Sequence, residues 1–186
     1  MRKDGIVLGF NPITNGKDTL QNSPDSIVKS WFSQMLFALK EPNLKNYNGN
    51  KEIYRFIWLR TFHHPISVRI EKQGEIIKVF TKVCDGAGGY EPGKLIQNTK
   101  QSVKEEDYKK LLDKLSSFNF WNIQNEKSDV NGNDGSEWII EAVKDNKYHV
   151  VSRWTPTRKG KTTFRDIGEY LISISTVKAA EIKDYY

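Results

Sequence analysis

Residues 65–83, PISVRIEKQGEIIKVFTKV, restrict the fold of this chain more than any other segment. Apolar and polar residues alternate on both sides of Gln73-Gly74, a pattern typical of two β-strands joined by a two-residue turn. A turn at these two residues pairs Ile70 with Ile77 and places the apolar side chains of both strands on one face. The segment therefore predicts an antiparallel hairpin with one apolar face.

Other periodic segments predict the remaining elements. Residues 53–60, IYRFIWLR, are apolar or aromatic on both faces, as in an interior strand. Residues 136–154 predict a second hairpin that turns at Asp145-Asn146. Apolar stripes at helical spacing predict three helices, which begin at Pro24, near Ser102 and near Thr163, the second with a capping box of Ser102 and Glu105.

The order of these elements predicts an α+β fold. We expect a mostly antiparallel sheet of about five strands, with about three helices on one of its faces and with one parallel strand pair as an open alternative. Residues 1–23 are expected to form a loose N-terminal arm, residues 24–180 the single domain and residues 181–186 a tail. Trp31 and Leu111 are expected to be buried between helix and sheet.

Composition narrows the class of protein. The 186 residues include one cysteine, Cys84, which excludes an internal disulfide framework. No stretch reaches the roughly 20 apolar residues of a membrane-spanning helix, so no membrane span is expected. Because no leader is recognisable, the expected location is the cytoplasm, and export with a leader removed is the alternative.

The positive charge is local. The chain has a net charge of +6, and residues 153–165, RWTPTRKGKTTFR, contain five basic residues and no acidic ones. This basic loop could bind an anion, with Arg153 and Arg158 as the forked donors that suit phosphate or carboxylate. Trp138 is opposite Arg153 in the second hairpin, which suggests a cation–π pair. Nucleic acid is not the expected partner, because no known binding motif accompanies the loop.

A glycine-rich segment imitates a nucleotide-binding loop. Residues 85–95, DGAGGYEPGKL, contain G-x-x-x-x-G-K ending at Lys94, but Leu95 replaces the hydroxyl residue that would bind magnesium. The next expected helix begins about seven residues late, so no helix N-terminus points at the loop. We therefore expect a tight turn and no nucleotide chemistry.

Two metal-site patterns are also incomplete. Residues 129–137, DVNGNDGSE, alternate acidic and amide residues as a calcium loop does, but Asp134 occupies the position of the required glycine and Ile140 that of the bidentate glutamate. His63 and His64 are adjacent in sequence, so on an extended segment they point to opposite sides and cannot readily share a metal. No metal site and no cofactor is expected.

Four segments together resemble a family of bacterial proteins of uncharacterised function. They are ALKEPNL, RFIWLRTFHHP, DGAGGYEPGKL and DGSEWIIEAVKDNKYHVVSRWTP, and the likeness covers about residues 25–175. The resemblance implies a bacterial source and a single domain. It implies no catalytic residue, but it places the glycine-rich loop and the histidine-bearing segments in one recurring unit.

The leading functional hypothesis is a non-enzymatic binding or interaction domain. The alternatives are a hydrolase-like enzyme that uses His63 or His64 with Asp85 and His149, and weak anion binding by the basic loop. No complete catalytic set is present, while polar residues concentrate in loops and at strand ends, where ligands are commonly bound. The candidate binding residues are His63, His64, Asp85, Tyr90, Lys94, His149, Arg153 and Arg158.

Overall fold

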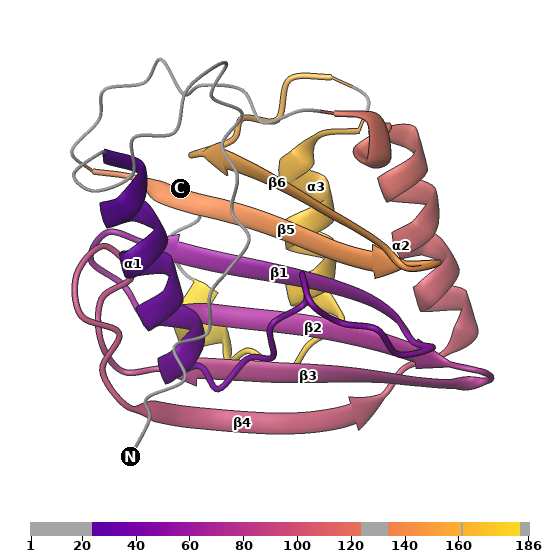
Figure 1. Ribbon diagram of the computed structural model, residues 1–186, viewed down its shortest axis with the longest axis horizontal. Coiled ribbons are helices and arrows are strands. Elements are labelled where there is room, and N and C mark those ends of the chain that lie inside the picture. Colours follow the sequence, from indigo (N-terminus) through magenta and orange to yellow (C-terminus); the bar gives the residue numbers. More distant parts are fainter. Residues whose placement is uncertain (1–23, 124–133, 161, 183–186) are drawn as a thin grey trace.

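A single antiparallel sheet forms the centre of the fold in the computed structural model, which describes residues 24–123, 134–160 and 162–182 (Figure 1). Its strand order is β4-β3-β2-β1-β5-β6, and all five neighbouring pairs are antiparallel. The strands are β1 (Glu52–Arg60), β2 (Ile66–Gln73), β3 (Ile76–Cys84), β4 (Leu95–Ser102), β5 (Ser136–Lys144) and β6 (Lys147–Trp154). The α+β class is confirmed, with six strands where about five were expected.

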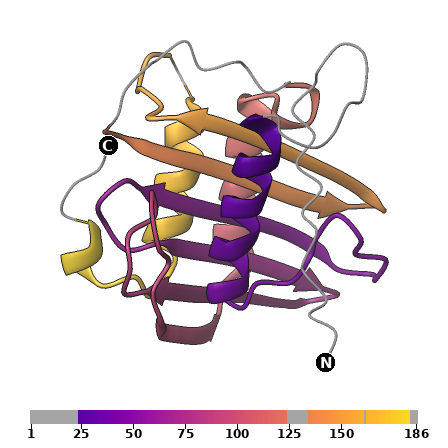
Figure 2. The same cartoon turned by 60° about the vertical axis from the view of Figure 1, so that its left-hand side comes forward.

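The helices cover both faces of the sheet, so the prediction that they share one face is wrong. Helix α1 (Pro24–Ala38) crosses one face, and helices α2 (Glu105–Ser117) and α3 (Phe164–Ser173) lie on the other (Figures 1 and 2). Two short 3₁₀ helices, η1 (Phe120–Asn122) and η2 (Ala179–Ile182), complete the described elements. The physical reason is visible in β1, whose apolar residues point alternately to the two faces, so that both faces need covering.

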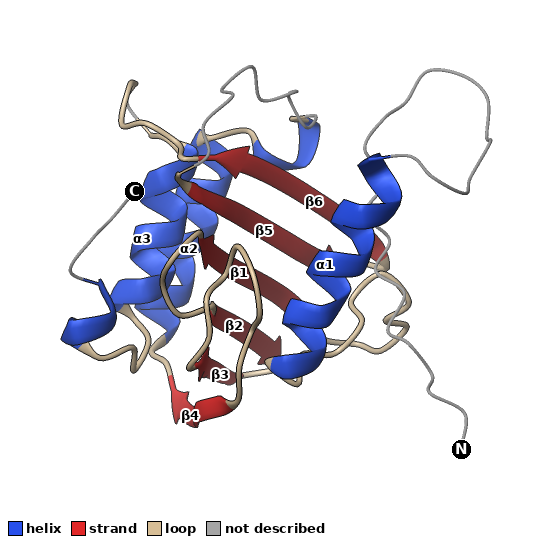
Figure 3. Cartoon of the chain, turned by 90° about the vertical axis from the view of Figure 1, so that its left-hand side faces the viewer, coloured by secondary structure: helices blue, strands red, loops and turns tan. Residues whose placement is uncertain are grey.

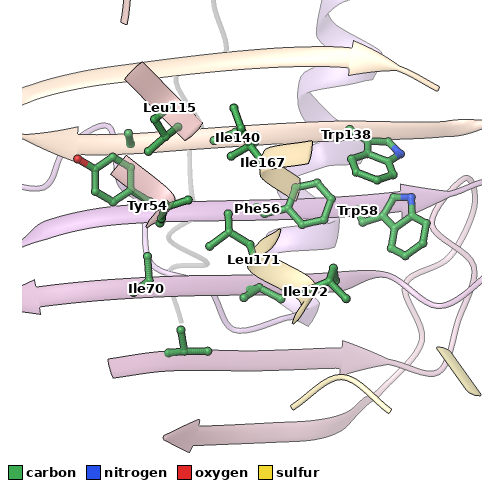
Figure 4. Packing of buried hydrophobic residues seen from close by; sticks show 14 of the residues in the cluster. Tyr54, Phe56, Trp58, Ile70, Leu115, Trp138, Ile140, Ile167, Leu171 and Ile172 are labelled. Carbon is green, nitrogen blue, oxygen red and sulfur yellow. The ribbon is translucent and has the colours of Figure 1, made fainter. Parts of the chain in front are cut away.

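The larger core lies between the sheet and helices α2 and α3. Trp58, Phe56 and Trp138 form a row of buried rings in it, against which Ile167 and Leu171 of α3 pack (Figure 4). Leu111 of α2 is fully buried there, as predicted. Burial of this apolar surface is the main source of stability for the fold.

A smaller core lies beneath α1 on the opposite face. It consists of Phe32, Met35, Leu36, Ile57, Leu59 and Ile139. Trp31 packs at its margin and is only partly buried, and its indole Nε1 donates a hydrogen bond to the carbonyl of Gly88, 3.0 Å away. The expectation of a buried Trp31 is therefore met only in part.

The second hairpin has the predicted register. Asp145 and Asn146 form the turn with φ of 51° and 58°, and Ala142 pairs with His149. In the first hairpin the turn falls at Gly74-Glu75, with Gly74 at φ 60°, and Ile70 pairs with Val79. The predicted pairing of Ile70 with Ile77 is wrong because the positive φ places the glycine first in the turn. The pairing moves by two positions, so every side chain keeps its face.

Strand β4 was not predicted, and it displaces the start of α2. Its sequence, LIQNTKQS, is polar and largely exposed, as suits an edge strand, and only pairing with β3 makes it a strand. Ser102 ends this strand, so the predicted capping box is wrong. The residue that precedes α2 is Lys104, whose side chain makes no capping hydrogen bond.

None of the helices in the described ranges is long and apolar enough to cross a membrane. The 3₁₀ helix η2 packs back on the domain, where Glu181 lies 2.8 Å from His64. The proposed arm, residues 1–23, lies outside the described residues, as do residues 183–186 of the tail.

Candidate functional site

Several loops meet at one end of the sheet, where β1, β3 and β6 end and β2 and β5 begin. We call this region the loop end and define it as residues 61–65, 85–94, 134–136 and 154–156. Figure 3 faces this end of the molecule. These loops include parts of three of the four segments on which the family resemblance is based, so the fold brings together residues that are far apart in sequence.

Backbone hydrogen bonds join the loops of the loop end to one another. The amides of Gly88 and Gly89 donate to the carbonyls of His63 and Thr61, over 2.9 and 3.2 Å. Thr61 in turn donates its amide and its hydroxyl to the carbonyl of Gly135, both over 2.9 Å. Such bonds between loops hold them in one arrangement, since each bonded group would otherwise need another partner.

The glycine-rich loop is folded on itself and on β1. The amides of Gly86, Ala87 and Tyr90 donate to carbonyls of the same loop, and those of Gly88 and Gly89 donate to residues 61–63. A phosphate loop needs these amides for its ligand, so here they are not available to a phosphate. A side chain at Gly88 would lie 2.7 Å from the backbone N and O of Arg60, which shows that this glycine permits close packing of two backbones.

Two exposed aromatic rings stand on this framework. Phe62 and Tyr90 are stacked with their ring centroids 6.0 Å apart and their planes 30° apart. Phe62 is 57% exposed and Tyr90 is 60% exposed. Tyr90 was a candidate binding residue from the sequence, but Phe62 was not. The sequence feature that could have identified Phe62 is its position directly before the candidate histidines His63 and His64.

The polar candidates at the loop end have structural partners. His64 Nδ1 lies 2.8 Å from the Glu181 carboxylate. Asp85 accepts a hydrogen bond of 2.6 Å from the amide of Lys94, which closes the glycine-rich loop. His63 lies between these loops, and its carbonyl accepts from Gly88. These contacts hold the loops in place.

His149 lies at the other end of the sheet. It pairs with Ala142, which pairs with Tyr54, six residues before Arg60 on β1. At about 3.4 Å per residue the separation from the loop end is about 20 Å. The His149 ring packs against Phe120, and burial lowers its pKa below the ordinary value, although backbone carbonyls partly offset this. The structure therefore does not bring His149 together with His63, His64 and Asp85.

The basic loop is partly neutralised. Arg158 and Arg165 both pair with Glu169 of α3, over 2.5 and 2.7 Å. Arg153 is 5.9 Å from the ring centroid of Phe164, and the residue over the Trp138 ring is Arg165, at 5.6 Å. Trp138 pairs with Arg153 across the hairpin as predicted, but the predicted cation–π contact between them is wrong, because α3 provides another ring for Arg153 and another cation for Trp138. Anion binding by this loop stays a prediction, with fewer free charges to support it.

Metal binding gains no support from the described part of the chain. Within residues 24–123, 134–160 and 162–182, no group of three or more His, Cys, Asp or Glu side chains could hold a metal ion. Most of the calcium-like segment, including Asp129, Asn131 and Asn133, lies outside the described residues.

A buried ionic network on the α1 face was missed from the sequence. Arg55 donates to Glu141 over 2.5 and 2.8 Å and to Glu41 over 3.2 Å. Glu41 also binds Arg69 and Lys82, at 2.8 and 2.9 Å. The sequence feature that could have predicted this network is the presence of Arg55 and Glu141 within the mostly apolar strands β1 and β5. A charged side chain that is buried in such a strand needs a partner of opposite charge.

Glu137 is a second missed group, on the same face of β5 as Glu141. It accepts a hydrogen bond from the Ser152 hydroxyl. Burial raises the pKa of the Glu137 carboxyl from 4.5 to about 7, although Arg153 partly offsets this. A carboxyl with a raised pKa close to the loop end is a feature of some functional sites, although structural ion-pair networks also shift pKa values.

The shifted pKa of Glu137 has a measurable consequence for stability. The folded chain holds this proton more tightly than the unfolded chain, so stability is lost as the pH rises from about 4.5 through about 7. Glu137→Gln should remove this loss, so near pH 8 its free energy of unfolding should exceed that of the wild type by about 1–3 kcal/mol. The two free energies of unfolding should converge toward pH 4. Urea unfolding at both pH values measures the difference. An equal stability difference at both pH values would contradict the raised pKa of Glu137. The control is Glu105→Gln, the same change at an exposed carboxylate.

Comparison with protein-family models finds no family that matches this chain, and comparison with curated proteins finds no match either. The bacterial family resemblance therefore stays a prediction based on the four sequence segments.

Proposed function

We propose that this chain is a non-enzymatic binding domain of a bacterial protein, and that it binds a protein partner through the loop end. The observation that carries the proposal is the stacked pair of Phe62 and Tyr90, each more than half exposed. Aromatic side chains are enriched at protein interfaces and contribute a large share of the binding energy there.

The framework beneath the rings supports this proposal. The hydrogen bonds from Gly88 and Gly89 to residues 61–63 fix the loop of Tyr90 against the loop of Phe62. A pair that is held before binding loses little side-chain entropy when a partner covers it. Asp85, Glu91 and Lys94 are exposed on the same loop and would form a polar rim around an aromatic centre, which is the usual composition of a protein interface.

Site-specific photocrosslinking tests the proposal in bacterial cells. A photoreactive amino acid at position 62 should give a discrete protein adduct. The same group at position 76 should not, because Ile76 is the first residue of β3 and lies at the opposite end of the sheet. Ile76 is a matched control, since it is 62% exposed.

The affinity of a partner found in this way should depend on the two rings. Replacing Phe62 and Tyr90 together with Ser should weaken its binding at least about tenfold, because aromatic anchors carry most of the energy of such interfaces. Ile76→Ser should leave the affinity unchanged. Equal adducts from positions 62 and 76, or no change in affinity in the double variant, would contradict the proposal.

A further inference from the structure

A second site lies on the α1 face, away from the loop end. A cavity of about 700 Å³ opens between the C-terminal end of α1, the segment 40–51 and strands β1 and β2. This is within the range of small-molecule sites, roughly 300–1,000 Å³. Its lining residues are Phe37, Lys40, Glu41, Pro42, Tyr47, Lys51, Ile53, Arg69 and Glu71.

The end of α1 builds one wall of this cavity. Lys40 has a left-handed φ of 52°, and the amides of Lys40 and Glu41 donate back to the carbonyls of Phe37 and Leu36. This is the Schellman arrangement, which reverses the chain at a helix C-terminus. The reversal directs Glu41 onto the sheet and leaves Phe37 at the rim, where its side chain is 68% exposed.

The charges around the cavity do not balance. The lining residues include the carboxylates Glu41 and Glu71 and the cations Lys40, Lys51 and Arg69. Behind the wall, the ion pairs of Glu41 extend to Arg55 and Lys82, and Arg55 pairs with Glu141, which makes three carboxylates and five cations in all. The formal surplus is two positive charges. Burial lowers the pKa of Arg69 despite the opposing effect of Glu41, as expected of a cation that its surroundings compensate only in part.

Arg69 also has an unused donor. Its Nε donates to Glu41 over 2.8 Å, its Nη1 contacts Glu71, and its guanidinium stacks on the Phe80 ring, 4.4 Å from the centroid. The described residues provide no hydrogen-bond partner for the remaining nitrogen, Nη2. Nη2 is also not among the fully buried polar atoms that lack a partner. Nη2 is therefore reached by solvent, on a side chain that lines the cavity.

We propose that this cavity binds a small amphiphilic carboxylate, an anionic head group with an aliphatic or aromatic body. The carboxylate would accept from Arg69 Nη2 and offset the surplus positive charge. The apolar body would cover Phe37, Pro42 and Tyr47, which with Ile53 are the apolar part of the wall. Glu41 and Glu71 do not exclude an anion, because each is bound to at least two cations.

Calorimetric titration and NMR of the labelled chain test this site with four probes. The other three probes each differ from octanoate in one property. Octanoate carries both the charge and the apolar body, octanamide lacks the charge, octylamine reverses it, and acetate lacks the body. Only octanoate is expected to bind, with resonance shifts at Phe37, Tyr47 and Arg69. Equal binding of octylamine or octanamide, or no binding of octanoate, overturns the proposal.

Two variants locate the binding. Phe37→Ser alters an exposed rim residue and leaves the ionic network intact, and it should weaken octanoate binding about tenfold through lost apolar contact. Arg69→Lys keeps the charge but removes Nη2, and it should weaken binding by a similar factor. Phe62→Ser, at the loop end, should change nothing. If Phe37→Ser and Arg69→Lys both bind octanoate as the wild type does, the ligand occupies another surface and the proposal fails.

Discussion

Glu41→Gln is expected to lower the free energy of unfolding by about 3–5 kcal/mol, because it removes one partner of a buried ionic network. The Glu41 carboxylate is fully buried and contacts Arg55, Arg69 and Lys82 within 3.2 Å. Gln has almost the same shape, so the loss is electrostatic: three buried cations would keep their desolvation penalty without the shared negative charge. Urea unfolding at neutral pH measures it.

The same chemical change at an exposed ion pair is the control. Glu105→Gln breaks a pair with Lys72 at a carboxylate that is 45% exposed, and it should change stability by less than about 1 kcal/mol. Equal effects of the two variants would contradict the assigned role of Glu41.

The pH dependence of Glu41→Gln gives a second test. Burial acts to raise the pKa of Glu41, but Arg55, Arg69 and Lys82 outweigh it and the pKa is lowered from 4.5. The stability that Glu41 contributes is therefore present above about pH 4.5 and is lost as the pH falls through the lowered pKa. The difference between wild type and Glu41→Gln should accordingly shrink in acid.

Gly168→Ala is expected to lower the free energy of unfolding by about 2 kcal/mol, although alanine is the better helix former by about 1 kcal/mol. A Cβ at position 168 would lie 2.7 Å from Cε3 and Cζ3 of Trp138 and 2.9 Å from Phe56. Trp138 cannot move aside, since it is fully buried between Phe56 and Trp58, with ring centroids 5.0 and 5.2 Å away (Figure 4). The steric conflict outweighs the gain in helix propensity.

A double-mutant cycle with Trp138→Phe checks this explanation. The smaller ring removes the atoms that the new methyl group would meet, so Gly168→Ala should cost less in the Trp138→Phe background than in the wild type. Trp138→Phe is itself destabilising, because it leaves a cavity and removes the 2.8 Å hydrogen bond from the indole to Ser136. Additive effects, or a stabilising Gly168→Ala, would contradict the packing argument.

The sequence by itself determined the elements whose information is local. The turn at Asp145-Asn146 follows from residues that tolerate positive φ, and it fixes the register of β5 and β6. The apolar pattern of residues 53–60 predicted an interior strand, and β1 lies between β2 and β5.

Only the tertiary structure decided features that depend on distant partners. Strand β4 is mostly polar and becomes a strand through pairing with β3. Helix α1 takes the face opposite α2 and α3 because both faces of β1 are apolar. The candidate sites have the same origin. Phe62 and Tyr90 stack only because two loops meet, and Glu41 meets Arg55 and Arg69 only because a helix end is directed onto the sheet. Contacts of this kind join residues separated by 14 or more positions, so no local pattern specifies them, and the folded chain alone brings them within hydrogen-bond distance.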